Sequence, residues 1–233
     1  MDNFLNFQVI ADNFTYFMIG RFPNGPLGGL GLTLYLALVS CLLSFCGGLV
    51  LGLLSLSKSR LIRWPTNIFI NTLRGMPLLM VIFWMYFLLP ALLGKTVPEN
   101  HTVIFGLTLF TSAYMSQIVR AGIEGIPKGQ TEAALSTGLQ PWQALLYIVL
   151  PQGLRNMIPS FVNQFVSLIK DTSLAFIVGV AELTHIGTQI NNRTMAYPTE
   201  IFIFIALVYF SICFLFTSCS RRLELRLAWR KDS

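Results

Sequence analysis

Long apolar runs separated by short polar stretches dominate the chain. A helix needs about 20 mostly apolar residues to cross the hydrocarbon core of a bilayer. Five stretches come close to that length or exceed it, and each predicts a membrane-spanning helix: residues 30–55, 66–93, 102–119, 157–180 and 201–220. The pattern therefore predicts an all-α integral membrane protein with five transmembrane helices and no internal repeat.

The composition agrees with this prediction and excludes other classes of protein. Of the 233 residues, 54% are hydrophobic and 11% are charged, whereas a soluble domain carries about 25% charged residues. The mean hydropathy is +0.66. These values exclude a disordered chain, a collagen and an ordinary soluble enzyme. The 4 cysteines lie in apolar runs without a CxxC pair, so we predict packing residues rather than metal ligands.

The basic residues predict the orientation of the spans. The net charge is +6, and most of the 16 Lys and Arg residues lie at one set of span ends: Lys58, Arg60, Arg63, Arg120, Lys128, Arg155, Arg221, Arg222, Arg226, Arg230 and Lys231. The opposite ends hold Arg21, Lys95 and Arg193. Because cytoplasmic loops are enriched in Lys and Arg, we predict that the N-terminus lies outside and the C-terminus in the cytoplasm.

This layout predicts three regions. Residues 1–28 form an N-terminal interfacial segment that lacks the basic start of a signal peptide. Its phenylalanines are expected near the lipid headgroups, with a frayed tail as the alternative: Phe4, Phe7, Phe14 and Phe17. Residues 29–221 form the transmembrane domain, which includes a cytoplasmic loop at 124–156. Residues 222–233 form a basic cytoplasmic tail.

The cytoplasmic loop is too long for a simple connection and reads as a helix–turn–helix. Pro127 opens the first helix and Gly138 suits a left-handed C-cap. Pro141 opens the second helix, and Pro151 is expected to end it. The second helix carries an apolar stripe: Trp142, Leu145, Leu146 and Val149. An interfacial pad that contacts only lipid is the alternative.

The loop carries a specific sequence resemblance. Glu132-Ala133-Ala134-x-x-x-Gly138, then nine residues, then Ile148-x-Leu150-Pro151, resembles the EAA loop of permease subunits in ATP-binding-cassette (ABC) importers. In that family the loop forms a coupling helix that sits in a cleft of the ATPase subunit. The resemblance implies the same contact here, with Glu132 as a charge, Ala133 and Ala134 as close-packing positions, Gly138 as the turn and Trp142 on the coupling surface.

Four further motifs narrow the resemblance to the polar amino-acid uptake permeases. They are Arg74-Gly75-Met76-Pro77-Leu78, Tyr114-x-x-Gln117-Ile118-x-Arg120-x-Gly122-Ile123, Ile126-Pro127-Lys128-Gly129-Gln130 and Lys170-Asp171-Thr172-Ser173-Leu174. Relatives often have Glu where this chain has Gln117. The resemblance implies the transmembrane fold of a type I importer, a second permease subunit (identical or similar) and an extracytoplasmic substrate-binding protein.

Three charges fall inside the predicted spans. At 1.5 Å per residue, Arg74 lies roughly 12 Å into its span, and Lys170 and Asp171 roughly 20 Å into theirs. A charge at that depth is costly and is expected to face the interior with a partner. We predict a substrate pathway that includes Arg74, Gly75, Pro77, Gln117, Lys170, Asp171, Thr172 and Ser173. The alternative is an Arg74–Asp171 ion pair that only joins two helices.

The sequence predicts no chemistry on this chain itself. It contains no GxxxxGK[ST] phosphate loop, HExxH or GxSxG. We therefore expect no catalytic residue, metal or cofactor here, with ATP and Mg²⁺ bound by a separate ATPase subunit. Glu182, Arg193 and Glu200 lie in an outer loop, where they either meet the binding protein or are simply solvated, and His185 is expected at the surface.

The predicted function is that of a multi-pass permease subunit in the bacterial cytoplasmic (inner) membrane. It would translocate a polar amino acid, driven by ATP hydrolysis on its partner. The alternative is an ion-driven secondary transporter of small polar solutes, which would be expected to show repeats and discontinuous helices at the midplane.

Overall fold

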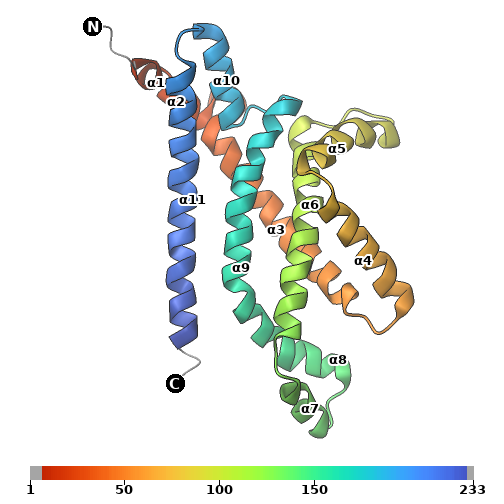
Figure 1. The fold of residues 1–233 in the computed structure, drawn as a ribbon. Coiled ribbons are helices and arrows are strands. Elements are labelled where there is room, and N and C mark those ends of the chain that lie inside the picture. The colour runs from red at the N-terminus through yellow and green to blue at the C-terminus, as the bar shows by residue number, and fades with distance from the viewer. Residues whose placement is uncertain (1–6, 230–233) are drawn as a thin grey trace. The chain divides into compact units, whose positions relative to one another are not determined.

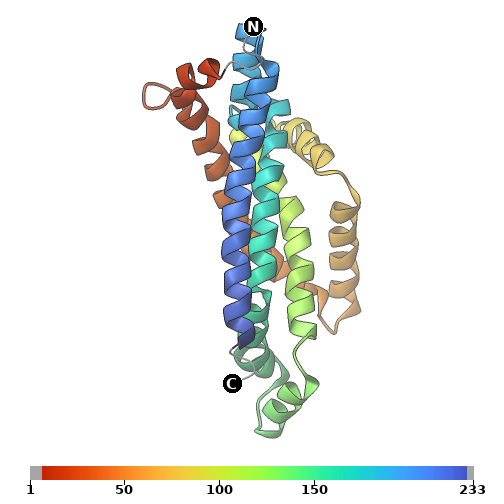
Figure 2. The same ribbon diagram turned by 60° about the vertical axis from the view of Figure 1, so that its left-hand side comes forward.

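In the computed structural model of the chain, the backbone is described for residues 7–229 and the side chains for residues 7–222. The named elements of the described part are helices joined by turns and short connections, and isolated bridges link Gly20 to Leu27 and Gly29 to Glu182. The element order in Figures 1 and 2 is α1 Gln8–Asp12, α2 Phe14–Ile19, α3 Gly29–Ser55, α4 Arg60–Gly75, α5 Leu78–Leu93, α6 Glu99–Glu124, α7 Lys128–Ser136, α8 Pro141–Gln143, a π-helical turn Ala144–Val149, α9 Leu150–Asp171, a 3-10 segment Thr172–Val178, α10 Leu183–Thr194 and α11 Pro198–Trp229.

The helices confirm the predicted all-α class, with one important difference. Among the described residues, four helical runs are long and apolar enough to cross a membrane: Gly29–Ser55, Glu99–Glu124, Pro141–Val178 and Pro198–Arg222. The predicted span 66–93 is not continuous, because α4 ends at Gly75 and α5 begins at Leu78. It counts as a span only if this bent pair is taken together.

Pro77 explains the break. Proline cannot donate a backbone hydrogen bond, and its ring drives the preceding residue out of the helical region. Met76 accordingly has φ −102° and ψ 148°, an extended conformation that ends α4. The motif Arg74-Gly75-Met76-Pro77 is therefore a helix end rather than the middle of a helix.

The chain divides into two compact units. Among the described residues, the first comprises 7–41, 77–107 and 165–218. Its core joins the N-terminal helices to α10 and α11 through Phe17, Ile186, Ile190, Ile201 and Ile205. Phe17 is 0% exposed and its ring packs edge-on against Phe204, with ring centroids 5.0 Å apart. Phe17 is therefore covered by the apolar surface of α10 and α11 and not by lipid, while its predicted level near the headgroups stays a prediction. Phe4 lies outside the described residues.

The second unit comprises 42–76, 108–164 and the described residues from 219 onward. Its centre is a close crossing of α3 and α6, made possible by glycines on α3. A Cβ atom on Gly48 would lie 2.5 Å from the Cβ of Met115, and one on Gly52 would lie 2.7 Å from the Cβ of Val119. The Ser44 hydroxyl donates to the Thr108 carbonyl at 3.2 Å. Small residues of this kind drive helix association in membranes, where backbones must approach closely.

Gly48→Ala should therefore destabilise the second unit although it adds a single methyl group. The neighbouring atom is a Cβ fixed to the backbone of α6, so the two helices must separate, which costs about 1–3 kcal/mol. The thermal unfolding midpoint in detergent measures this effect. Val50→Leu also adds a methylene to α3, at a position that is 57% exposed, and should leave the midpoint unchanged. Equal midpoints for the two variants would contradict the close crossing.

Candidate functional site

The predicted helix–turn–helix is present at the end of α6, where α7 and α8 reverse the chain into α9 (Figure 1). The turn between the two helices depends on Gly138, whose φ of 90° lies in the left-handed region. Its N–H donates to the Leu135 carbonyl at 3.0 Å, and the N–H of Leu139 donates to the Ala134 carbonyl at 3.3 Å. These bonds close the end of α7, as expected for a glycine C-cap.

The second helix of the loop differs from the prediction at Pro151. The chain does not stop there, because α8 leads through the π-helical turn Ala144–Val149 directly into α9. Pro151 cannot donate to the preceding turn and its ring would clash with a carbonyl there. The π-helical turn changes the bonding register just before it, with the Leu150 N–H donating to the Leu145 carbonyl. The helix therefore continues through the proline.

The change of register also alters which side chains of the loop are covered. Ala144 and Val149 are buried, whereas Trp142 is 56% and Leu146 47% exposed. The predicted stripe of Trp142, Leu145, Leu146 and Val149 is thus divided between two faces. Trp142 is held in place by its indole N–H, which donates to Gln140 Oε1 at 2.7 Å. The loop consequently presents apolar side chains outward.

Some residues of the EAA-type motif are buried and others are exposed. On α7, Ala134 is buried, while Glu132 and Ala133 are exposed. Gln152, at the start of α9, ties the loop to this helix: its amide N–H donates to the Ile148 carbonyl at 3.0 Å and to Gln130 Oε1 at 3.4 Å. The loop therefore exposes a charge and one small alanine side chain on a helix that is hydrogen-bonded to the start of α9.

Arg74 is placed by the end of α4 and contacts α6. Its guanidinium carbon lies 5.4 Å from the centroid of the Tyr114 ring, within the range of a cation–π interaction. The Tyr114 hydroxyl donates to the Arg74 carbonyl at 3.5 Å. Two of the sequence motifs therefore meet here, and Gln117 follows one turn later on α6. Arg74, Gly75 and Pro77 are exposed.

The other predicted pathway residues lie in the first unit, at the end of α9. Lys170 is exposed, Asp171 and Ser173 are half-buried and Thr172 is buried. The Thr172 hydroxyl donates to the Ile169 carbonyl at 2.7 Å, so its proton is already used in a hydrogen bond to the preceding turn. The pairing of Arg74 with Asp171 stays a prediction.

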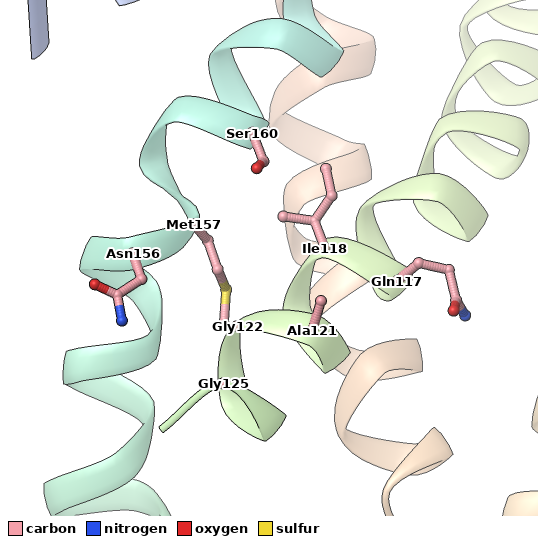
Figure 3. Close-up of a pocket in the computed structure, with 8 residues that line it drawn as sticks. All are labelled: Gln117, Ile118, Ala121, Gly122, Gly125, Asn156, Met157 and Ser160. Atoms are coloured by element: carbon pink, nitrogen blue, oxygen red, sulfur yellow. The ribbon is translucent and has the colours of Figure 1, made fainter. Parts of the chain in front are cut away.

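A hollow of about 430 Å³ lies between α6 and α9 in the second unit (Figure 3). Its wall contains Ala121, Gly122 and Gly125 from α6 and its C-terminal connection, and the Met157 side chain reaches toward Gly122. Gln117 and Asn156 stand at opposite edges, and Ser160 lies on the same side as Asn156. None of the described residues that line this hollow is charged. Its polar side chains, Gln117, Asn156 and Ser160, can donate and accept hydrogen bonds.

Comparison with known proteins identifies the family to which the chain belongs. The family described as binding-protein-dependent transport system inner membrane component matches residues 44–229. The chain belongs to this family.

Individual relatives agree with the family. The chain is 42% identical over 200 residues to the probable glutamine ABC transporter permease protein of Bacillus subtilis (strain 168), covering 85% of this chain and 91% of that protein. It is 32% identical over 193 residues to the glutamate/aspartate import permease protein of Escherichia coli O157:H7, covering 80% and 86%. The crystal structure of an amino acid ABC transporter with histidines matches with a TM-score of 0.84 and 28% identity over 95% of this chain and 99% of that one.

These matches confirm the fold of a type I ABC importer permease and the family predicted from the motifs. They give no support to an ion-driven secondary transporter. In this family the ATPase is a separate subunit and the permease is a multi-pass membrane protein of the inner membrane.

Two carboxylates of the permease are buried, although the sequence placed them in an outer loop, either meeting the binding protein or simply solvated. Glu200 is 6% exposed, and Glu182 is 0% exposed. Its carboxylate oxygens accept from the backbone N–H groups of Thr184 and His185, both at 2.8 Å, and from the Tyr209 hydroxyl at 3.0 Å. Glu182 is thus the N-cap of α10. A Glu directly before Leu183-Thr184-His185 was the available signal, but its burial depends on α11.

Glu182 lies in the connection before α10, outside the candidate spans. Burial raises the pKa of Glu182 from 4.5 to about 7, although its hydrogen bonds oppose the shift. Because the folded-state pKa lies above the unfolded one, the group stabilises the fold most when neutral. That contribution is complete below pH 4.5 and is lost as the pH rises through about 7.

Glu182→Gln, which stays neutral, should remove this pH dependence. Relative to the variant, the parent permease should lose thermal stability between about pH 5 and pH 8, the window set by the two pKa values. Melting in detergent at both pH values measures the difference. Glu99→Gln changes an exposed glutamate and should track the parent at both values. A parent-minus-variant difference that is constant with pH would contradict the assignment.

Proposed function

We propose that the chain carries a polar amino acid inward across the cytoplasmic membrane, coupled to ATP hydrolysis on a separate subunit. The observation that carries this proposal is the exposed helix–turn–helix with its EAA-type motif, in a chain whose family and fold are those of importer permeases. The relatives named for glutamine and for glutamate/aspartate import support a polar amino acid as the substrate.

The proposed topology has five spans, with the bent pair α4–α5 taken as one. The N-terminus lies outside and the C-terminus in the cytoplasm, so the loop faces the ATPase. Residues 1–28 form the outer N-terminal segment, 29–221 the permease domain and 222–233 the basic tail. The basic tail begins within α11, which continues past residue 222 to Trp229, and residues 230–233 lie outside the described residues.

The coupling surface is formed by the exposed side of the loop. Glu132, Ala133 and Trp142 contact the ATPase, which binds the ATP and Mg²⁺ that this chain does not bind. The remaining motif residues build that surface from behind: Ala134 and Gly138 set α7 and its turn, and Ile148, Leu150 and Pro151 continue into α9. A second permease subunit and an extracytoplasmic binding protein complete the importer.

The substrate pathway includes the exposed end of α4 with Arg74, Gly75 and Pro77, and Gln117 on α6. It also includes Lys170, Asp171, Thr172 and Ser173 at the end of α9. Arg74 and Lys170 are exposed cations, which suits the α-carboxylate that every amino acid carries. Gly75 has nothing within 4 Å of a built Cβ, so a ligand can approach the backbone there.

Reconstitution tests the proposed function directly. The permease, its ATPase and its binding protein are placed in proteoliposomes, and uptake of radiolabelled amino acids is measured with ATP supplied on the ATPase side. We expect ATP-dependent uptake of at least one polar amino acid, and none when a sodium or proton gradient replaces ATP. Uptake driven by an ion gradient alone would contradict the proposal.

A further inference from the structure

One helix of the permease presents a continuous row of polar side chains. On α9, Asn156, Ser160, Asn163, Ser167 and Lys170 follow one another at intervals of four, three, four and three residues, which places them on one face of the helix. All are exposed except Ser167, which is half-buried. We call these five residues the α9 stripe. At 1.5 Å per residue it extends about 21 Å along the helix.

The other face of α9 is occupied, which fixes the direction of the stripe. In the second unit, Met157 packs on Gly122 of α6 and the Phe161 ring packs edge-on against Phe45 of α3, with centroids 5.1 Å apart. In the first unit, Leu168 and Ile169 are 0% exposed. The stripe therefore faces away from the chain's own core along the helix.

An exposed polar row of this length does not suit lipid. α9 belongs to a candidate span, and polar or ionisable groups within a span face a water-filled cavity or another protein surface. The uncharged members are two amides and two hydroxyls, groups that both donate and accept hydrogen bonds. Such groups can bind the ammonium and the carboxylate of a zwitterion equally well.

The hollow described above lies at one end of the stripe. Asn156 and Ser160 contribute to its lining, and its volume of about 430 Å³ falls in the range of small-molecule sites, about 300–1,000 Å³. The row of polar side chains therefore ends beside a hollow of this size.

We propose that the α9 stripe is a wall of the translocation pathway. Asn156, Ser160, Asn163 and Ser167 exchange hydrogen bonds with the passing amino acid, and Lys170 attracts its carboxylate. Among the residues proposed for the pathway, Lys170 and Arg74 outnumber Asp171, so the pathway favours neutral and acidic polar amino acids over those with a cationic side chain. This inference rests on the proposed function. It adds the helix face that lines the pathway and the class of amino acid that the pathway favours.

Thiol labelling in the assembled complex tests the wall. The native cysteines are replaced by serine, and single cysteines are introduced at Asn156, Ser160, Asn163 and Ser167. A sulfonated methanethiosulfonate reagent is then applied to open membrane vesicles. The thiolate is the nucleophile that attacks the reagent and displaces its sulfinate group, and a thiolate forms in water but not in hydrocarbon. We therefore expect these positions to react roughly tenfold or more faster than Phe210→Cys.

Phe210→Cys is the matched control. Phe210 on α11 is 64% exposed in the chain, so exposure alone predicts fast labelling there as well. Equal rates at Phe210 and the stripe would overturn the proposal. If oxidation instead joins two copies through Asn163→Cys and labelling fails there, the stripe is an interface between permease subunits and the proposal is wrong.

Competition for uptake tests the substrate class. Unlabelled glutamine and glutamate should inhibit uptake of the labelled substrate at lower concentrations than arginine does. Lys170→Gln should reduce the ratio of these inhibitory concentrations by about tenfold, which corresponds to about 1.4 kcal/mol. Arginine competing as well as glutamine in the parent would overturn this part. If the parent takes up no amino acid, the proposed function fails, while the labelling pattern still reports whether water lines α9.

Discussion

Replacing Gly138 by tryptophan should uncouple ATP hydrolysis from uptake and lower transport by about tenfold or more. The residue has φ 90°, and an L side chain in the left-handed region costs about 1–2 kcal/mol. Nothing lies within 4 Å of a Cβ built there, so the effect comes from the backbone and not from a clash. We expect the turn between α7 and α8 to change, which displaces the surface that contacts the ATPase.

Gly94→Trp is the matched control for this variant. Gly94 also has a positive φ, 65°, and nothing within 4 Å of a built Cβ, but it ends α5, remote in sequence from the loop. It should keep substrate-stimulated ATP hydrolysis. The measurement is hydrolysis and uptake by the purified complex, both normalised to assembled permease. Coupling at the parent level in Gly138→Trp would contradict the role of the loop.

Glu132→Lys tests the same surface without altering the backbone. The side chain is exposed on α7, so charge reversal should leave the fold intact and weaken binding of the ATPase. Co-purification with the ATPase subunit measures this loss. Glu99→Lys reverses an exposed charge at the start of α6 and should co-purify normally.

The double variant Arg74→Met/Asp171→Leu should assemble normally but lose most of its uptake. If both residues contact the transported molecule, removing both removes charges that bind it. If they serve only as an ion pair, removing one leaves an unpaired charge within the membrane, which is costly, while removing both is far milder. The two roles therefore predict opposite results for the double variant.

Uptake per assembled complex is the deciding measurement. Near-normal uptake by the double variant would reject the substrate role and leave a helix-joining pair. Tyr114→Phe serves as a control, because it keeps the ring beneath the Arg74 guanidinium and removes the hydroxyl that donates to the Arg74 carbonyl. It should transport nearly as well as the parent. Tyr114→Leu removes the ring and should lower uptake if the cation–π contact positions Arg74.

Apolar length and local turn chemistry determined several features from the sequence alone. The runs 30–55, 102–119 and 201–220 each fall within one helix, because twenty apolar residues have few alternatives to a helix in a bilayer. Gly138 marks its turn because only the left-handed region closes the end of α7 there. The EAA-type motif also indicated the family, because residues at a fixed spacing in one loop can be recognised without the tertiary structure.

Other features required the tertiary structure, because they depend on partners distant in sequence. Phe17 and Glu182 are buried because α10 and α11 cover them, and neither residue's own neighbours in sequence reveal this. Tyr114 meets Arg74 across 40 residues. The helix passes Pro151 because a π-helical turn shifts its register. The polar spacing along α9 was visible in the sequence, but only the packing of Met157 and Phe161 decided that this row faces away from the core, since periodicity defines a face and contacts decide what it meets.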